Sequence, residues 1–188
     1  HKSLIVRKTG RTHRDSTFAE IQNAIYDLGI YYLFRVNRSD MRITYTPHNS
    51  EFIFAGLDDV EKLKSIQGIT DVWIEEATET IENDFDQVDL RIRGVTKVSK
   101  QITMTFNPID AMHWIKRRFF DNPDKETLIV KTIYKHNNFL DKEYIARLKN
   151  LKRIDPIKYN IYALGNWGVL GNIIFTNYEI HEFDEYDE

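Results

Sequence analysis

Two adjacent carboxylates, Glu75 and Glu76, directly follow an apolar segment, residues 72–74, that has the pattern of a buried strand. One carboxylate of such a pair can hold a magnesium ion or its bound water. The next can polarise a water molecule that attacks a terminal phosphate. Successive strand residues point in different directions, which suits two separate roles. The alternative is a pair of acids that begins a surface helix and interacts with its dipole.

A hydroxyl and an amide close the next predicted strand, residues 102–106. Thr105 and Asn107 share one side of the extended chain, where they can hydrogen-bond a γ-phosphate or the attacking water. The alternative is a strand that simply runs into the turn formed by Asn107 and Pro108.

A basic loop follows the first predicted strand, residues 3–6. It contains Arg7, Arg11 and Arg14, and His1 and His13 are near it in the sequence. Guanidinium groups bind phosphate in a bidentate way, whether the phosphate belongs to a nucleotide or to a DNA backbone. The sequence leaves both possibilities open, together with an ordinary solvated loop.

One expected partner of the acids is absent. A phosphate-binding loop of the form G-x-x-x-x-G-K-[ST] should precede the first strand, but no Gly is followed by Lys anywhere in the 188 residues. The candidate acids therefore lack the segment that would hold a triphosphate.

Apolar strands that alternate with helices predict a mainly parallel α/β sheet with one antiparallel hairpin near residues 41–55. Chemistry in such sheets takes place at the carboxyl ends of the strands. Thr17 and Glu20 have the spacing of a capping box, and Gly29 should end the helix that follows. Further strands are expected at 31–36, 51–55 and 128–132, and further helices at 58–66, 81–92, 111–120, 141–151 and 155–164.

Composition limits the class of protein. The chain has 41% apolar residues, enough for one compact domain, and no Cys, which excludes disulfides, thiolate metal sites and cysteine nucleophiles. Its apolar runs are too short to span a bilayer. The formal charge of −3 hides blocks of +4 at residues 1–42, −9 at 58–90, +9 at 91–158 and −6 at 178–188. Such blocks suit a polyanion-binding surface beside a carboxylate-rich centre, or ordinary solvated helix faces.

Taken together, these segments resemble the ATPase domain of a tailed-phage terminase large subunit, in the subgroup of phages and prophages of Gram-positive bacteria. The segments occur in the family's order over nearly the whole chain. The matching stretches are 4–8 with 14–16, 54–59 with 62–66, 73–77, 105–108 with His113 and Trp114, 137–141, and 164–169 with Gly171 and Phe175.

The resemblance implies a role for each candidate. Glu75 would hold Mg²⁺, through water, and Glu76 would activate water for ATP hydrolysis. The family's coupling motif falls on residues 103–107, which puts phosphate sensing on Thr103, Thr105 and Asn107. Related terminases place a basic residue about a dozen positions before the acids, where it acts on a neighbouring subunit's nucleotide. That position falls near Lys64, with Lys62 as the second candidate.

The resemblance also implies an organisation. Residues 1–135 would form a P-loop-type ATPase core without its first strand and phosphate loop, 136–172 a small helical lid, and 173–188 a linker towards an absent nuclease domain. ATP and Mg²⁺ are the implied cofactors. The implied partners are double-stranded DNA, a portal protein, a small terminase subunit and further copies in a ring, with no membrane. The implied location is the bacterial host cytoplasm rather than the mature virion, and the fragment alone should be inactive.

A rival from another class is a non-catalytic nucleic-acid-binding or assembly module that uses residues 91–158 as a phosphate track. Its affinity would fall steeply with salt and would ignore both ATP and changes at Glu75 and Glu76.

Overall fold

The computed structural model describes residues 1–168, apart from the side chains of residues 60–62. The described residues form two compact units, the first made of residues 1–107 and 113–128 and the second of 108–112 and 129–168. Among the described residues, no helix has the length and apolar character needed to cross a membrane.

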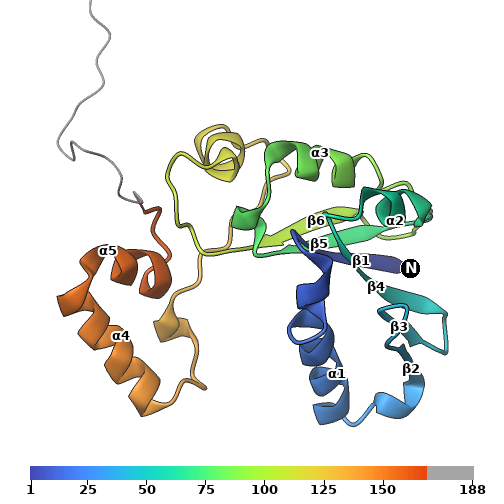
Figure 1. The fold of residues 1–188 in the computed structure, drawn as a ribbon, viewed down its shortest axis with the longest axis horizontal. Coiled ribbons are helices and arrows are strands. Elements are labelled where there is room, and N and C mark those ends of the chain that lie inside the picture. The colour runs from blue at the N-terminus through green and yellow to red at the C-terminus, as the bar shows by residue number, and fades with distance from the viewer. Residues whose placement is uncertain (169–188) are drawn as a thin grey trace, which may run out of the picture. The chain divides into compact units, whose positions relative to one another are not determined.

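The first unit is built on a six-stranded sheet with the order β2-β3-β4-β1-β5-β6 (Figure 1). The strands are β1 (Lys2–Arg7), β2 (Phe34–Asn37), β3 (Arg42–Tyr45), β4 (Ser50–Gly56), β5 (Asp71–Glu75) and β6 (Gln101–Thr105). Strands β4, β1, β5 and β6 are parallel neighbours, whereas β2 and β3 are added antiparallel at one side. The predicted mainly parallel α/β sheet with an antiparallel hairpin is therefore confirmed.

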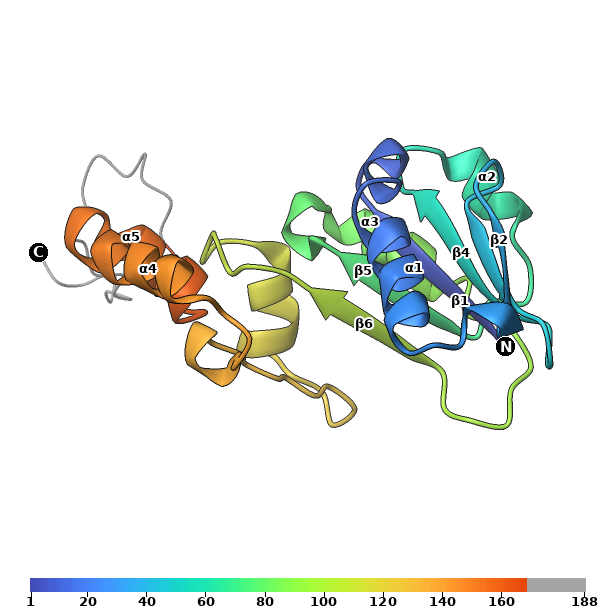
Figure 2. The same cartoon turned by 90° about the horizontal axis from the view of Figure 1, so that it is seen from below.

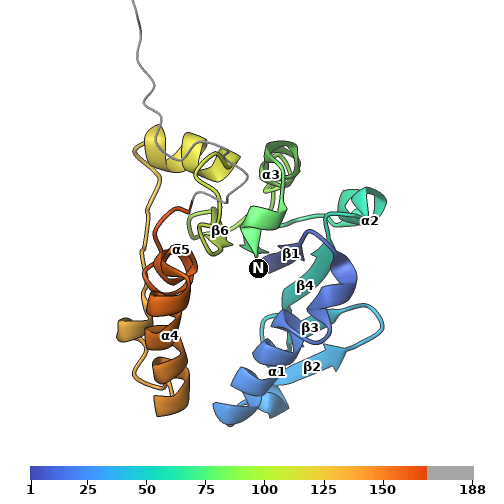
Figure 3. The same ribbon diagram turned by 60° about the vertical axis from the view of Figure 1, so that its left-hand side comes forward.

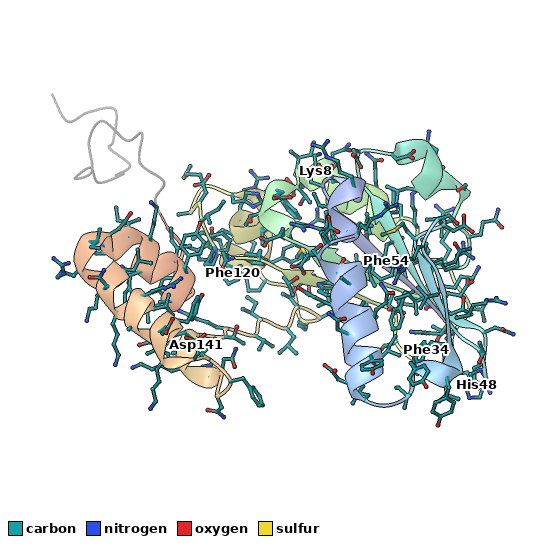
Figure 4. The ribbon with its side chains drawn as sticks, turned by 60° about the horizontal axis from the view of Figure 1, so that its bottom comes forward. Lys8, Phe34, His48, Phe54, Phe120 and Asp141 are labelled. Atoms are coloured by element: carbon teal, nitrogen blue, oxygen red, sulfur yellow. The ribbon has the colours of Figure 1, made fainter. Side chains whose placement is uncertain are left out.

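Helices cover both faces of this sheet. Helix α1 (Thr17–Asp27) lies on one face, and α2 (Val60–Ser65) and α3 (Glu82–Asp89) lie on the other (Figure 3). Successive residues Leu4, Ile5 and Val6 of the central strand are all buried, as expected when both faces are covered. On the α1 side the Phe18 and Phe54 rings meet edge to face, with centroids 4.9 Å apart. Figure 4 labels Phe54.

The start of α1 differs from the prediction. The N-cap is Ser16 rather than Thr17, and no side chain caps the helix. The Thr17 hydroxyl instead lies 2.7 Å from Nδ1 of His13, whose Nε2 donates to the Ala55 carbonyl over 3.0 Å. His13 is fully buried, so it cannot serve a surface phosphate site. Gly29 does follow the helix with a φ of +69°, as predicted.

Several predicted elements change in the structure. No strand forms at 128–132, and Leu128 and Val130 are 84% and 73% exposed, because no described strand lies alongside to pair with them. Apolar Leu28, just after α1, is 70% exposed. Short 3-10 turns occupy Gly10–His13, Tyr31–Leu33, Ala77–Glu79 and Tyr134–His136, and a π-helical segment occupies Lys116–Asp121.

The second unit is helical. Helix α4 (Lys142–Ile154) begins at Asp141, whose carboxylate accepts from the Tyr144 N–H over 2.6 Å (Figures 2 and 4). Helix α5 (Pro156–Lys158) continues into a π-helical turn at Tyr159–Ala163. The small core of the second unit consists of Leu148, Tyr159 and Ala163. The predicted helices near 141–151 and 155–164 are thus present.

The role of this helical unit as a lid, and its expected boundary after residue 135, stay predictions. The expected linker at 173–188 lies outside the described residues, as do Gly171 and Phe175.

Candidate functional site

The carboxyl ends of the four parallel strands meet at one edge of the sheet, because parallel neighbours run in the same direction. In the strand register Arg7 lies opposite Gly56, and Glu75 lies opposite Thr105. Residues nearly a hundred positions apart are thereby gathered at one edge, the place where open α/β sheets bind ligands.

Glu75 and Thr105 are in direct contact across this edge. The Thr105 hydroxyl donates a hydrogen bond to Oε2 of Glu75 over 2.7 Å. The same hydroxyl oxygen accepts from the indole N–H of Trp73 over 2.8 Å. The structure therefore brings together the predicted metal carboxylate and the predicted phosphate-sensing hydroxyl.

Glu76 occupies an unusual backbone conformation. Its φ and ψ of 52° and 49° lie in the left-handed region, which a residue with a Cβ seldom adopts. Strand β5 ends at Glu75 and a 3-10 turn begins at Ala77, so Glu76 alone makes the change of direction. Strained residues of this kind cluster at functional sites.

The surroundings of Glu76 favour its neutral form. Burial raises the pKa of the Glu76 carboxyl above its ordinary value of 4.5, and repulsion from Glu75 and Glu79 raises it further, while Arg7 lowers it. A carboxyl with a raised pKa can hold or accept a proton closer to neutral pH, which suits a residue that activates water.

Arg7 ends β1 beside this pair of acids. Its Nη1 donates to the Ser16 hydroxyl over 3.1 Å, while its Nε is buried without a hydrogen-bond partner. The guanidinium is therefore held in place near Glu76.

Two glycines let the loops at this edge approach closely. A Cβ on Gly56 would lie 2.3 Å from the Gly10 backbone nitrogen and 1.9 Å from Oδ1 of Asp58. The Gly10 N–H donates to that same Asp58 oxygen over 3.0 Å. Only residues without side chains fit at this crossing of the β1 and β4 loops.

Lys8 joins the β1 loop to α3. Its Nζ lies 2.7 Å from Oδ2 of Asp84, an oxygen that also accepts from the Ile81 N–H at the start of the helix (Figure 4 labels Lys8). Lys8 therefore has a carboxylate partner, whereas the hydrogen bond of Arg7 is to the Ser16 hydroxyl.

The two acids suit one particular kind of metal binding. Within residues 1–168 no group of three or more His, Asp or Glu side chains is placed to hold a metal ion by itself. Mg²⁺ keeps several waters and often uses one or two carboxylates together with substrate phosphates. Glu75 and Glu76 thus fit a magnesium ion that arrives with a nucleotide, and they do not fit a free-standing metal centre.

The other predicted residues lie at different distances from the acids. Thr103 faces Trp73 in the register, two positions below the edge, and Asn107 is exposed just beyond β6. Arg11 and Arg14 are exposed on the loop after β1. The described part of the chain shows no hydrogen bond from any of these four to Glu75 or Glu76.

Lys64 lies elsewhere. It is exposed near the end of α2, where it lines a shallow cleft of about 480 Å³ with Gln67, Arg91 and Arg93. This cleft lies at the opposite, amino-terminal end of β5, so Lys64 does not meet the acids of its own chain. The side chain of Lys62 lies outside the described residues.

Sequence reasoning missed three participants: Trp73, the Lys8–Asp84 pair and the Gly10–Gly56 crossing. The position of Trp73, two residues before Glu75 and so on the same strand face, was a usable signal. The other two join segments 76 and 46 residues apart, which no local pattern reveals.

Comparison with known proteins gives matches to a phage protein family. A family model described as "Phage terminase large subunit" matches residues 1–166. The PBSX phage terminase large subunit of Bacillus subtilis is 30% identical over 97% of this chain, which spans 46% of that relative, or about half its length.

Solved structures agree on the fold. The large terminase of a thermophilic bacteriophage, solved in complex with ADP, matches with a TM-score of 0.70 at 20% identity, over 89% of this chain and 40% of that one. The large terminase ATPase domain of Thermus phage P74-26 matches with a TM-score of 0.54 at 11% identity, over 88% of this chain and 76% of that one.

Proposed function

Since the chain belongs to the phage terminase large subunit family, we propose that it supplies one wall of the ATPase site of a DNA-packaging motor. The observation that carries the proposal is the carboxyl edge of the sheet. There Glu75 is hydrogen-bonded to Thr105, and the strained Glu76 has a raised pKa. The ADP complex of the thermophilic-phage terminase, which shares the fold, is further support for a nucleotide at this site.

The two acids take different roles in this proposal. Glu75, held by Thr105, would hold the Mg²⁺ of an ATP complex through water, and Glu76 would orient the attacking water and accept its proton. When bound, the metal ion neutralises charge on the phosphates. Arg7 lies close enough to Glu76 to interact with its charge, so it can contact the same phosphates.

Thr105, with Thr103 on the same strand and Asn107 just beyond it, forms the coupling segment of this proposal. Thr105 contacts the proposed metal carboxylate and lies shortly before Pro108–Met112, which belong to the second unit. Loss of the terminal phosphate would change the hydrogen bonds of this strand end, and the change would pass along the chain towards the helical unit, the proposed lid.

The phosphate-binding loop must come from outside the described residues. Strand β6 is an edge strand in the described sheet, and it lies directly beside Glu75. Its free backbone groups can pair with one further parallel strand, which would bring a loop to the acids. We expect this loop in the longer protein, since no Gly–Lys pair occurs in the chain.

The remaining assignments concern the assembled motor. Exposed Lys64, far from the acids of its own chain, would act on the nucleotide of a neighbouring copy in a ring, with Lys62 as the second candidate. Arg11 and Arg14 would contact phosphate or DNA. The partners are double-stranded viral DNA, a portal protein and a small terminase subunit, in the cytoplasm of the bacterial host. A nuclease domain would follow in the longer protein.

The direct test is Glu76→Gln in a terminase large subunit that contains this chain. We expect ATP turnover to fall about 1000-fold, since the amide cannot accept the proton, while binding of a fluorescent ATP analogue stays within about twofold. Glu20→Gln, on an exposed part of α1, is the control and should leave both quantities unchanged.

Turnover near the wild-type rate in the Glu76→Gln variant would contradict the assignment. The 188-residue chain by itself should show no ATPase activity. Tight DNA binding by that chain, steeply dependent on salt and indifferent to ATP, would favour the non-catalytic binding module instead.

A further inference from the structure

A chain of hydrogen bonds with one allowed direction runs from Trp73 to Glu75. The indole N–H of Trp73 is a donor and cannot accept, so the Thr105 oxygen 2.8 Å away must accept from it. The single proton of that hydroxyl is then directed at Oε2 of Glu75, 2.7 Å away. In this series of hydrogen bonds the indole can only donate, so the Thr105 hydroxyl accepts from Trp73 and donates to Glu75.

Trp73 is a firm starting point for this chain. Its ring packs against the core under α1, which includes Ile5, Phe18 and Phe54. The pleat places Trp73 and Glu75 on one face of β5, and the parallel register puts Thr105 opposite Glu75 on the neighbouring strand. The buried core therefore fixes the indole, and the indole fixes the hydroxyl.

Thr105 alone could not hold the Glu75 carboxylate in one orientation. It is exposed on an edge strand, where its hydroxyl can rotate and can exchange its partner for water. A glutamate side chain has three rotatable bonds, and it loses the freedom of all three when it is held in one geometry. An indole donor occupies one of the hydroxyl's two lone pairs and excludes the orientations in which the O–H points towards Trp73.

We propose that Trp73 is a positioning residue that orients Glu75 for metal binding through the Thr105 hydroxyl. The proposal deepens the proposed function and rests on it for the identity of the ligand. Groups that orient metal-binding side chains in this way commonly change metal affinity about 10-fold to 100-fold when they are removed.

The geometry can be tested in the 188-residue chain without nucleotide. The chain has three tryptophans, so a ¹H–¹⁵N spectrum should show three indole signals, and Trp73→Phe identifies one by its loss. Thr105→Val should shift that signal upfield, because the indole N–H loses its acceptor, whereas Thr105→Ser should preserve it.

Thr103→Val is the matched control, because Thr103 lies on the same strand and face and faces Trp73 in the register without accepting from its indole. An indole signal that is unmoved in Thr105→Val, or that moves equally in Thr103→Val, overturns the proposed chain of hydrogen bonds.

The functional consequence is tested in a terminase large subunit that contains this chain. Thr105→Val should raise the Mg²⁺ concentration for half-maximal ATP turnover about 10-fold or more, and Trp73→Phe about threefold to 10-fold. Saturating Mg²⁺ should restore most of kcat, and Thr105→Ser should behave like the wild type. A loss of kcat at every Mg²⁺ concentration, with no change in the half-maximal value, overturns a positioning role.

The proposed function and the role of Trp73 would be contradicted by different results. A parent protein that hydrolyses no ATP overturns the proposed function. Normal turnover by the parent together with an unchanged Mg²⁺ requirement in Trp73→Phe overturns the role of Trp73 and leaves the function intact.

Discussion

The two ends of the parallel strands in the first unit are built differently. At the carboxyl edge, Glu76 has a left-handed backbone, its carboxyl is pushed towards the neutral form, and two loops cross at a glycine contact. At the amino edge, Lys2 and Thr70 exchange hydrogen bonds of 3.0 Å, and His1 lies 2.6 Å from Asp71.

Basic residues at the amino edge also form hydrogen bonds to backbone carbonyls. Arg91 donates to the Leu63 carbonyl and Arg93 to the Leu90 carbonyl, which satisfies groups near the ends of α2 and α3. The two edges differ in chemistry rather than in backbone strain, since Asn49 at the amino end of β4 is also left-handed. The carboxyl edge carries the acid with the raised pKa, and the contacts at the amino edge hold the strands in register.

The largest expected effect on the free energy of unfolding is at the contact between Gly10 and Gly56. Gly56→Ala should lower the free energy of unfolding by about 3 kcal/mol, since the new methyl group meets backbone that cannot move aside. Gly68→Ala at the amino edge is the matched control. Its φ is +76° but its nearest neighbour is 3.9 Å away, so only the left-handed conformation is penalised, by about 1 kcal/mol. Urea denaturation of the chain measures both. Equal losses would show that the loop crossing is not tight.

The ion pairs of the two edges give a second contrast. Asp84→Ala should cost about 2 kcal/mol, because the carboxylate is largely buried and serves both Lys8 and the Ile81 N–H. Asp71→Asn should cost about 0.5 kcal/mol, since its partner His1 is 42% exposed. The same denaturation experiment reports both values, and a larger loss for Asp71→Asn would reverse the comparison.

The smallest effect concerns pH. The pKa of Glu76 is raised in the folded chain, so the wild type should lose stability as pH rises through that pKa. Glu76→Gln carries no charge, so it should be more stable than the wild type at pH 7, and the difference should vanish below the ordinary glutamate value of 4.5. Thermal unfolding between pH 4 and 8 measures this. A Glu76→Gln variant less stable than the wild type at pH 7 would contradict the raised pKa.

The fold was predictable in its main outline and less so in detail. The apolar run at residues 3–6 predicted a buried strand, which is β1, and the hairpin expected near 41–55 is formed by β3 and β4. The capping box at Thr17 was wrong because the Thr17 hydroxyl bonds the His13 ring, four residues earlier, rather than a backbone N–H of the helix. The strand at 128–132 was wrong because no strand of the described residues lies beside that segment.

Some residues of the candidate site were predictable from the sequence, and others were not. Residue type and spacing picked out Glu75, Glu76 and Thr105, since carboxylates and hydroxyls at strand ends are visible in one dimension. The roles of Asn107, Lys64 and the arginines of the first loop stay predictions. Trp73 read only as part of a buried strand, because its indole finds its acceptor 32 residues away.

The amino-acid sequence by itself determined the order of strands and helices, the placement of two acids at a strand end and the lack of a Gly–Lys loop, all of which depend on neighbours along the chain. Tertiary structure alone decided that Thr105 reaches Glu75, that Arg7 lies near Glu76, that Lys64 faces the other edge and that Glu76 turns left-handed. Those contacts depend on which strands pair and in what register. Pairing is settled by the burial of the whole sheet between its helices rather than by any single segment.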